Sequence, residues 1–374
     1  MAITNHFFSF FPQYHSDPIN DRAWGDGFTD WDLIKAVPEW QRTAFMPSCG
    51  YYDPSSSKYL NSLSSQLDAL PLHNAGLMVY HYNFDGVSAL SGFEKQLLAQ
   101  SKNSPPFFLC WANETWSKRW IGKPGEVLIE QKHIVSIDLI QKHARYLAQF
   151  FEKPNYHYVR GRPLFIVYDA NASATLPAAL KMYREAFSEL GHNPLIGTCI
   201  GYSLPTAQLH PYDFGCEFQP RFFFNSRNSS LLVKVASQIK TRFPKPFEWI
   251  GGQRDRLRKL EGAHTFKYID YLNAIQSGAL ENQLGSIVGS LPLMRSTFLT
   301  WDNLPRYGNR STRVDHSGVS LESLASLSKL HSQDGLPILI NSWNEWSEGA
   351  ALEPGLLNHP LRDEFFRILS NQSH

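Results

Sequence analysis

The sequence lacks the features that mark several large classes of protein. Its 374 residues contain 35 lysines and arginines against 34 aspartates and glutamates, a formal net charge of +1. A near-neutral chain without a basic stripe gains little by displacing counterions from phosphates, which argues against nucleic acid as a partner. No run of about 18 apolar residues occurs, and Met1 to His15 do not form a signal peptide. We therefore expect a cytoplasmic protein without membrane insertion.

Metal-binding and nucleotide-binding signatures are also absent. The four cysteines, Cys49, Cys110, Cys199 and Cys216, have no metal-ligand spacing, so free thiols in a reducing compartment are expected. No G-x-G-x-x-G or G-x-x-x-x-G-K-[ST] string follows an apolar run, and no H-E-x-x-H string occurs. We therefore expect neither a metal nor an organic cofactor.

What the sequence does contain is an alternation of short apolar runs with amphipathic segments. Hydrophobic residues make up 43% of the chain, which is enough for a large core. The apolar runs predict strands at Phe7–Phe10, Leu77–Tyr80, Phe107–Trp111, Leu164–Tyr168, Leu195–Ile200, Phe214–Phe218, Thr297–Trp301 and Ile338–Trp343. Apolar residues spaced at i, i+3, i+4 and i+7 predict helices at Tyr59–Leu72, Phe93–Ala99, Leu139–Phe151, Leu176–Leu190 and Leu321–Leu330.

Buried strands that alternate with helices form parallel sheets covered on both faces. Eight such units favour an α/β fold, a (β/α)8 TIM barrel, with a doubly wound open sheet as the alternative. We predict one barrel domain over residues 1–374, with elaborated loops after the strands. The pattern is least regular between Asn225 and Ser296, where Leu231–Ile239 and Phe266–Ile275 are predicted as helices and Arg254 to Lys259 as solvated surface.

Aromatic residues next to polar ones follow almost every predicted strand. The carboxyl ends of the strands form the ligand site of a parallel barrel. A pyranose stacks its apolar face on an aromatic ring, while its hydroxyls need fixed donors and acceptors. Because packing has no need for this composition at so many strand ends, we predict a carbohydrate substrate. The candidate binding residues are Gln13, His81, Tyr82, Trp111, Asn113, Glu114, Trp116, Trp301, Asp302, Arg306, Asn344 and Trp346.

The sharpest signal is a pair of glutamates, Glu345 and Glu348, after the last predicted strand. Glycosidic cleavage uses one carboxylic acid to protonate the leaving oxygen and a second carboxylate as base or nucleophile. In a strand-to-helix turn both glutamates can point into one pocket, where mutual repulsion and nearby tryptophans would raise the pKa of one of them. The alternative is a purely structural role, in which a glutamate caps the following helix or pairs with an arginine. This alternative has more weight for Glu348 than for Glu345. Glu114 is a third candidate that spacing does not rank against them.

Several strings of the chain resemble one known family. They are Phe11-Pro-Gln-Tyr-His15, Trp24-Gly-Asp-Gly-Phe-Thr-Asp-Trp31, Cys110-Trp-Ala-Asn-Glu-Thr-Trp116, Trp301-Asp-Asn-Leu-Pro-Arg306 and the block from Trp343 to Pro354. In this order they resemble the WbsX-like proteins, bacterial relatives of glycoside hydrolase family 99 that are often encoded with polysaccharide biosynthesis genes.

The resemblance implies a (β/α)8 barrel and metal-independent action on an α-mannoside-like linkage with retention. In that family the first glutamate of the last block assists the sugar's 2-hydroxyl as it attacks the anomeric carbon, through an anhydro-sugar intermediate. The second glutamate is the general acid and base at the leaving oxygen. By motif these roles fall on Glu345 and Glu348.

Three other functions compete with a retaining glycoside hydrolase. A metal-dependent glycosyltransferase or other glycan-assembly protein would use an Asp-x-Asp pair, and Asp30-Trp-Asp32 fits that string, although it follows a loop and no nucleotide-binding pattern accompanies it. A silent carbohydrate-binding protein has little use for two closely spaced glutamates. A zinc hydrolase is disfavoured because lone histidines such as His73, His143 and His192 are predicted on solvated or helix-terminal surfaces. We therefore predict a metal-independent glycosidase linked to surface-polysaccharide metabolism.

Overall fold

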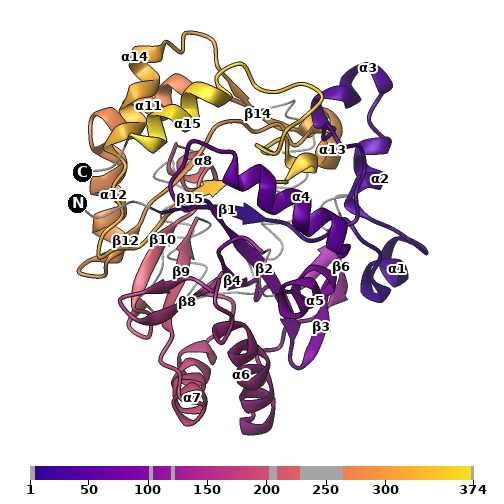
Figure 1. The fold of residues 1–374 in the computed structure, drawn as a ribbon, viewed down its shortest axis with the longest axis vertical. Coiled ribbons are helices and arrows are strands. Elements are labelled where there is room, and N and C mark those ends of the chain that lie inside the picture. Colours follow the sequence, from indigo (N-terminus) through magenta and orange to yellow (C-terminus); the bar gives the residue numbers. More distant parts are fainter. Residues whose placement is uncertain (1–4, 101–103, 119–122, 202–208, 228–263, 372–374) are drawn as a thin grey trace.

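A parallel sheet lies at the centre of the protein, and helices and long loops surround it (Figure 1). The computed structural model describes residues 5–100, 104–118, 123–201, 209–227 and 264–371. The main path of the sheet runs through β12 (Leu293–Met294), β10 (Phe214–Glu217), β9 (Leu195–Ile200), β8 (Arg162–Val167), β4 (Phe107–Trp111), β2 (Gly76–Phe84), β1 (His6–Phe10), β15 (Ile338–Asn341) and β13 (Ser296–Phe298).

The two ends of this path lie next to each other in the chain. β12 pairs with β10 and β13 pairs with β15, both in parallel, and only Arg295 separates β12 from β13. The Arg295 carbonyl accepts a hydrogen bond of 2.9 Å from the Leu339 amide, so it also contacts β15. β12 and β13 therefore serve as one interrupted strand that nearly closes the barrel. The α/β barrel predicted from the sequence is confirmed.

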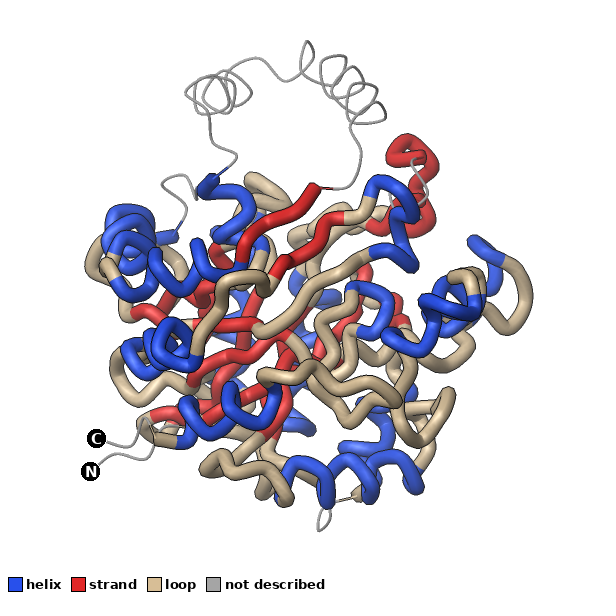
Figure 2. The backbone as a smooth tube through the Cα atoms, turned by 90° about the horizontal axis from the view of Figure 1, so that it is seen from above, coloured by secondary structure: helices blue, strands red, loops and turns tan. Residues whose placement is uncertain are grey.

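Helices cover the outside of the sheet, as the view from above shows (Figure 2). The longer ones are α4 (Ser57–Asp68), α5 (Gly92–Ala99), α6 (Ile137–Phe151), α7 (Leu176–Glu189), α11 (Tyr268–Gln276), α12 (Ala279–Val288) and α15 (Arg362–Ser370). The shorter helices, including 3₁₀ turns labelled η, are α1 (Pro18–Trp24), α2 (Asp30–Lys35), α3 (Glu39–Arg42), η1 (Thr43–Phe45), α8 (Arg221–Arg227), α13 (Leu304–Tyr307), η4 (Gly308–Arg310), α14 (Leu321–Leu324), η5 (Ala325–Lys329) and η6 (Trp346–Glu348).

Short strands lie in the connections between the barrel elements. β3 (Val87–Ala89) and β7 (Tyr158–Val159) pair antiparallel with β2 and β8. β5 (Trp116–Lys118) and β6 (Lys123–Ile129) form an antiparallel hairpin after β4, and β11 (His264–Lys267) pairs in parallel with β14 (Thr312–Asp315). The hairpin and the loops after β1, β13 and β15 supply most of the site described below.

Helix α6 illustrates how the sequence pattern produces the outer layer. Its apolar stripe, which includes Ile140, Leu147 and Phe151, is buried against the sheet and α7, and the two helices lie side by side in Figure 1. Each fully buried side chain of this kind stabilises the fold by about 1.5–3 kcal/mol. At the start of α4 the Ser56 hydroxyl accepts a 3.3 Å hydrogen bond from the Tyr59 amide, which satisfies a donor that the helix leaves unpaired.

The predicted elements correspond to the observed ones with identifiable exceptions. The strand predicted at Thr297–Trp301 begins earlier and is shorter, because the chain is interrupted at Arg295 and leaves the sheet after Phe298. The first two residues of the helix predicted at Phe266–Ile275 belong to β11 instead. Leu231–Ile239 and the basic run from Arg254 to Lys259 lie outside the described residues. In the part of the chain that the structure describes, no helix combines the length and hydrophobicity needed to span a bilayer.

Candidate active site

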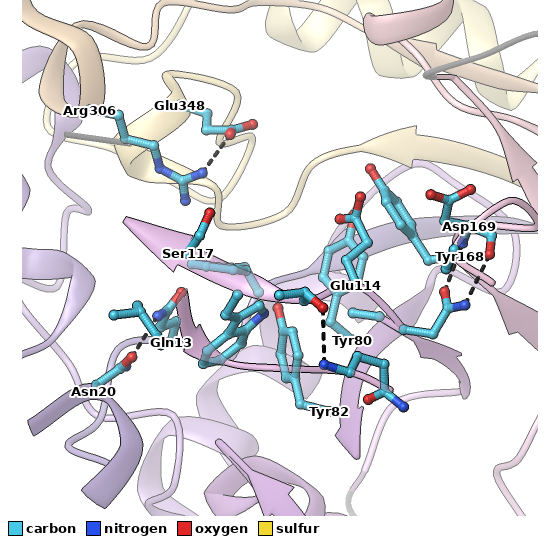
Figure 3. Close-up of a pocket in the computed structure, with 18 of the residues that line it drawn as sticks. Gln13, Asn20, Tyr80, Tyr82, Glu114, Ser117, Tyr168, Asp169, Arg306 and Glu348 are labelled. Carbon is cyan, nitrogen blue, oxygen red and sulfur yellow. Dashed lines mark hydrogen bonds and ion pairs between the residues drawn. The ribbon is translucent and has the colours of Figure 1, made fainter. Parts of the chain in front are cut away.

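A cavity of about 390 Å³ opens above the carboxyl ends of β1, β2, β4, β8 and β15. It is lined by aromatic rings, amides, carboxyls and two guanidinium groups. The lining residues are Phe11, Gln13, Asn20, Trp24, Tyr80, Tyr82, Ala112, Asn113, Glu114, Thr115, Trp116, Ser117, Leu128, Gln131, His133, Tyr168, Asp169, Ala172, Arg221, Arg306, Tyr307, Glu345 and Glu348. Figure 3 shows Gln13 and Asn20 toward one end of the cavity and Tyr168 and Asp169 toward the other.

The tight turn after β15 brings Glu345 and Glu348 into the cavity wall together. The Ser342 hydroxyl accepts a hydrogen bond of 2.9 Å from the Glu345 amide. The Glu348 amide in turn donates to the Glu345 carbonyl at 3.2 Å, which closes the single turn of η6. The two residues are 6% and 5% exposed, so both carboxyls are largely removed from bulk water.

Arg306 from α13 is the cation at the centre of this acidic cluster. Its Nη1 donates to Glu348 Oε1 at 2.5 Å, and its Nε donates to the Ser347 hydroxyl at 2.8 Å. Its Nη2 lies 4.0 Å from Glu345 Oε2 and 3.7 Å from Asp30 Oδ2. Arg221, the first residue of α8, approaches Glu348 at 3.8 Å. The guanidinium groups therefore lie closer to Glu348 than to Glu345.

This asymmetry separates the two glutamates electrostatically. Burial raises the pKa of Glu345 well above its usual range, the charge of Glu348 raises it further, and Arg306 and Arg221 oppose the rise. Glu348 has the close arginine contacts that stabilise an ionised carboxylate. When the pair holds one proton, that proton resides mainly on Glu345. A carboxylic acid beside a carboxylate is the arrangement that general acid and base chemistry requires.

Two tyrosines on β2 complete the floor near these carboxyls. Burial and the neighbouring Glu345 raise the pKa of Tyr80 and Tyr82 well above the usual value for a phenol. Both hydroxyls therefore stay protonated at neutral pH and are able to donate hydrogen bonds. Trp116 packs edge-on against Tyr82 with ring centroids 4.9 Å apart, so an aromatic wall continues from the barrel into the β5–β6 hairpin.

Eight of the residues predicted as site residues line the cavity: Gln13, Tyr82, Asn113, Glu114, Trp116, Arg306, Glu345 and Glu348. The amide of Asn113 is already engaged, because its Nδ2 donates to the Asp169 carbonyl at 2.9 Å and its Oδ1 accepts from the Asp169 amide at 2.8 Å. Asn113 therefore joins the ends of β4 and β8. The Gln13 amide donates to Asn20 Oδ1 at 3.2 Å and links the loop after β1 to α1.

Asn344 and Trp346 were predicted to bind sugar hydroxyls and rings, but neither is among the residues that line the cavity. Asn344 accepts from the Phe11 amide and donates to the Phe11 carbonyl, both at 2.8 Å, which joins β1 to the loop after β15. The Trp346 indole donates to Glu353 Oε2 at 3.0 Å. Both side chains thus hold the turn that carries Glu345 and Glu348.

Trp301 and Asp302 also lie beside the cavity rather than in its wall. Trp301 is 4% exposed and packs against Phe224 of α8. The Asp302 carboxylate pairs with Arg313 at 3.3 Å, and its backbone amide donates to the Glu348 carbonyl at 2.9 Å. The contribution of Asp302 to the site is therefore made through the backbone that holds Glu348.

His81 and Trp111 face the helices outside the barrel and not the cavity. His81 Nδ1 lies 2.9 Å from Glu94, and its Nε2 lies 2.8 Å from Nε2 of His143. The Trp111 indole donates to the Asn83 carbonyl at 3.0 Å. The prediction that His143 lies on a solvated or helix-terminal surface is wrong: it is 3% exposed in the middle of α6, because it completes this polar chain behind β2.

Sequence reasoning missed several residues of the cavity wall. Arg221 follows β10 by four residues and begins a helix, so it lies outside the short strand-end strings. Gln131 and His133 follow the β5–β6 hairpin, which is an insertion and carries no strand-end signal. His133 is placed by its Nε2, which donates to the Asn113 carbonyl at 3.0 Å. Tyr168 ends the predicted strand Leu164–Tyr168 and Asp169 follows it, so both fit the aromatic-polar pattern, although neither was named as a candidate binding residue.

The Asp-x-Asp string does not form one site. Asp30 is fully buried beside Arg306, whereas Asp32 caps the start of α2 through the Thr29 amide and pairs with Lys35 at 3.0 Å on the surface. Among the described residues, no group of three or more histidines, cysteines, aspartates and glutamates is arranged to hold a metal ion.

Comparison with known proteins places the chain in a family. Residues 7–360 match the family described as glycosyltransferase WbsX. The chain belongs to the WbsX family. Two uncharacterized WxcX proteins of Xanthomonas campestris pv. campestris, from strains B100 and ATCC 33913, are each 26% identical over 92% of this chain. The alignment covers 46% of each relative, so the WbsX chain spans about half the length of the curated relatives it matches.

Solved structures show which barrel proteins share the WbsX fold seen here. The GH99 endo-alpha-mannosidase from Bacteroides thetaiotaomicron matches with a TM-score of 0.54 and 13% identity, over 98% of this chain and 95% of that one. A glycoside hydrolase-like protein matches with a TM-score of 0.56 and 11% identity, over 100% and 94% of the two chains. At these identities the likeness establishes a common fold.

Proposed function

We propose that the chain is a retaining, metal-independent glycoside hydrolase that acts on an α-mannoside-like linkage in a polysaccharide or oligosaccharide. The observation that carries this proposal is the convergence of Glu345 and Glu348 on Arg306 in an aromatic-walled cavity. The GH99-like fold and the WbsX family membership agree with it. The names of the family and of the WxcX relatives support a link to surface-polysaccharide metabolism.

The proposed chemistry follows the roles that the family resemblance assigns. The 2-hydroxyl oxygen of the sugar attacks the anomeric carbon while Glu345 accepts the hydroxyl proton. The glycosidic carbon–oxygen bond breaks, and the leaving oxygen takes a proton from Glu348. Water then attacks the anomeric carbon and gives a proton to Glu348, while the bond from this carbon to the 2-oxygen breaks and the 2-oxygen takes its proton back from Glu345. The two inversions restore the original anomeric configuration.

Before this reaction, the single proton of the pair has to lie on Glu348, whereas the contacts of the free protein favour Glu345. Both carboxyls approach Arg306 in the wall of the same cavity, so the proton has a short path between them. A bound sugar supplies the reason for the transfer, because a hydroxyl that donates to Glu345 stabilises its carboxylate form. The pair is thus proposed to exchange its proton when the substrate binds.

Tyr80, Tyr82 and Trp116 are proposed to hold the sugar against these carboxyls. The protonated phenols supply hydrogen-bond donors, and the indole supplies a stacking face. Gln13 and Asn20 at one end of the cavity, Glu114 between the ends and Asp169 toward the other end add polar groups along its length. This extent favours binding of more than one sugar unit.

Transfer to a sugar hydroxyl instead of water is the second candidate, because the WbsX family is described as a glycosyltransferase family. The same two carboxyls can serve both acceptors. A metal-dependent transferase that uses Asp30 and Asp32 is less well supported, since these side chains occupy separate environments.

The deciding experiment incubates the full chain with defined α-mannosides and with the polysaccharide made by its neighbouring genes, in EDTA. NMR follows the anomeric product in the first minutes. Release of a retained product supports the hydrolase, and a longer saccharide formed at the expense of the donor supports transfer. Activity that appears only with a sugar nucleotide and a divalent cation, or glycan binding without turnover, would reject the proposal.

A further inference from the structure

Asp30 is a buried carboxyl next to the site that the mechanism above does not use. It begins α2, and its backbone amide donates to the Gln13 carbonyl at 3.0 Å, which fixes it against the loop after β1. Its relative exposure is 0%, and it does not line the cavity. A bound sugar therefore does not touch it.

The surroundings of Asp30 connect it to both glutamates through one cation. Arg306 Nη2 lies 3.7 Å from Asp30 Oδ2 and 4.0 Å from Glu345 Oε2, while Nη1 contacts Glu348. Tyr14, a buried phenol, and Glu348 are further titratable groups that interact with Asp30. Figure 3 shows Arg306 reaching over the cavity toward Glu348.

A charge count shows what this arrangement does. Asp30, Glu345 and Glu348 are three buried carboxyls, and Arg306 and Arg221 are the guanidinium groups beside them, although Arg221 also interacts with Glu114. Full ionisation would leave one negative charge uncompensated in a site with little water, which is costly. The cluster therefore retains one proton.

Packing alone does not account for Asp30. Among the described residues neither carboxyl oxygen has a hydrogen bond of ordinary length, and the guanidinium of Arg306 lies 3.7 Å away, so this buried carboxyl costs free energy that an apolar residue would avoid. Burial raises the pKa of Asp30 and the positive charge of Arg306 opposes the rise, so the carboxyl responds to the same cation as the glutamates.

We propose that Asp30 is a positioning residue that draws Arg306 toward α2 and thereby keeps one proton on the Glu345–Glu348 pair. By competing for Arg306, it prevents this cation from neutralising both glutamates at once. Its catalytic consequence rests on the proposed function, but its effect on protonation does not.

The test compares Asp30→Asn with Asp32→Asn in the full chain. Asp32 is a matched control because it is a carboxylate on the same helix, exposed and paired with Lys35. NMR of protein labelled with ¹³C at glutamate carboxyls follows the titration of Glu345, whose signal is identified by its loss in Glu345→Gln. Asp30→Asn should lower the Glu345 midpoint by about one pH unit or more. Asp32→Asn should leave the midpoint unchanged.

Activity provides a second reading. Since Asp30 does not touch the sugar, Asp30→Asn should lower kcat at neutral pH about tenfold and leave KM unchanged, with the upper limb of the pH profile moved to lower pH. Asp30→Glu restores the charge and should return both the midpoint and kcat most of the way to wild type. If the chain hydrolysed none of the substrates, the proposed function would be rejected. The NMR titration would still test the effect of Asp30 on the protonation of Glu345.

Three results would overturn the proposal. One is an unchanged Glu345 midpoint in folded Asp30→Asn. Another is an equal shift in Asp32→Asn. The third is a fall of the Glu345 midpoint by about one pH unit in Asp30→Glu, because this variant keeps the negative charge to which the effect is assigned. The Asp30→Glu measurement also decides the question if circular dichroism shows that Asp30→Asn does not fold.

Discussion

Arg306 and Glu348 meet through a hydrogen bond of 2.5 Å between Nη1 and Oε1 while both side chains are almost completely buried. This contact ties α13 to η6, and α13 follows the strand that closes the barrel. The same guanidinium serves Ser347 and approaches Glu345. Arg306 therefore links the geometry of the cavity wall to the charge of both proposed catalytic groups.

The first prediction concerns the removal of this cation. Arg306→Met should destabilise the protein by about 3–5 kcal/mol at neutral pH, because it leaves buried carboxylates without their partner. Arg306→Lys keeps the positive charge but loses the forked set of hydrogen-bond donors, so its stability should lie between those of wild type and Arg306→Met. Urea unfolding at pH 7 measures the effect. Equal stability of Arg306→Met and wild type would show that the ion pair contributes nothing at this site.

The second prediction separates the roles of the two glutamates. Glu345→Gln and Glu348→Gln should each lower kcat by about 10²–10⁴-fold on a mannoside with a poor leaving group, while leaving the fold intact. With an activated aryl leaving group, which departs without protonation, Glu348→Gln should recover most of its rate and Glu345→Gln should not.

Initial rates with a dinitrophenyl and an alkyl α-mannoside measure this difference. If the activated substrate instead restored the rate of Glu345→Gln, the general acid would be Glu345, the glutamate that holds the proton in the free protein. Full activity of either variant on both substrates would remove that residue from the mechanism.

The barrel was predictable because buried strands and amphipathic helices carry local sequence signals. Phe107–Trp111 and Leu195–Ile200 were predicted with the bounds the structure has, since each is a mostly apolar run that begins directly after a proline. The nearness of Glu345 and Glu348 followed from their separation in a tight turn. Their roles and the division of the chain into one domain remain predictions.

What could not be predicted depends on side-chain direction and on contacts between distant segments. His81 lies between Tyr80 and Tyr82 on β2, so the alternation of the strand turns it outward while the tyrosines face the cavity. Because both faces of β2 are buried, the sequence pattern does not show which of its side chains point inward. Arg306 and Asp30 are far apart in sequence, and only the fold brings them together.

The third prediction concerns Gly349, which directly follows the second glutamate. Its φ is +59°, and an added Cβ would lie 2.5 Å from the Asp302 carbonyl oxygen. Because the Asp302 amide holds the Glu348 carbonyl, Gly349→Ala should displace the turn and lower both stability and activity. Gly161 is a matched control: its φ is +75° and nothing lies within 4 Å of the added Cβ.

Gly161→Ala should therefore cost only the backbone strain, about 1–2 kcal/mol, and keep full activity. Gly349→Ala should lose clearly more stability in urea unfolding, with kcat reduced at least tenfold if the proposed chemistry holds, since one tenfold step corresponds to about 1.4 kcal/mol in the barrier. Similar losses in the two variants would mean that the contact with Asp302 is not needed.

The last prediction concerns Glu353, a buried carboxyl whose partners are all neutral. It accepts hydrogen bonds from Tyr52 at 2.6 Å, Tyr59 at 3.2 Å and the Trp346 indole at 3.0 Å. Burial raises the pKa of Glu353 from 4.5 to about 7, although these three donors oppose the rise. Between these values the folded protein binds more proton than the unfolded chain, so stability from this group is lost as pH rises toward 7.

Above pH 7 the ionised Glu353 should cost about 3 kcal/mol relative to its protonated form. Glu353→Gln removes this dependence, so its stability relative to wild type should increase from pH 5 to pH 8. Glu364→Gln, at a half-buried carboxylate paired with Arg367, should show no such trend. Urea unfolding of the three proteins at both pH values provides the measurement. Because the buried histidines are common to all three, they cancel in the differences, and a parallel pH dependence of wild type and Glu353→Gln would exclude the proposed titration.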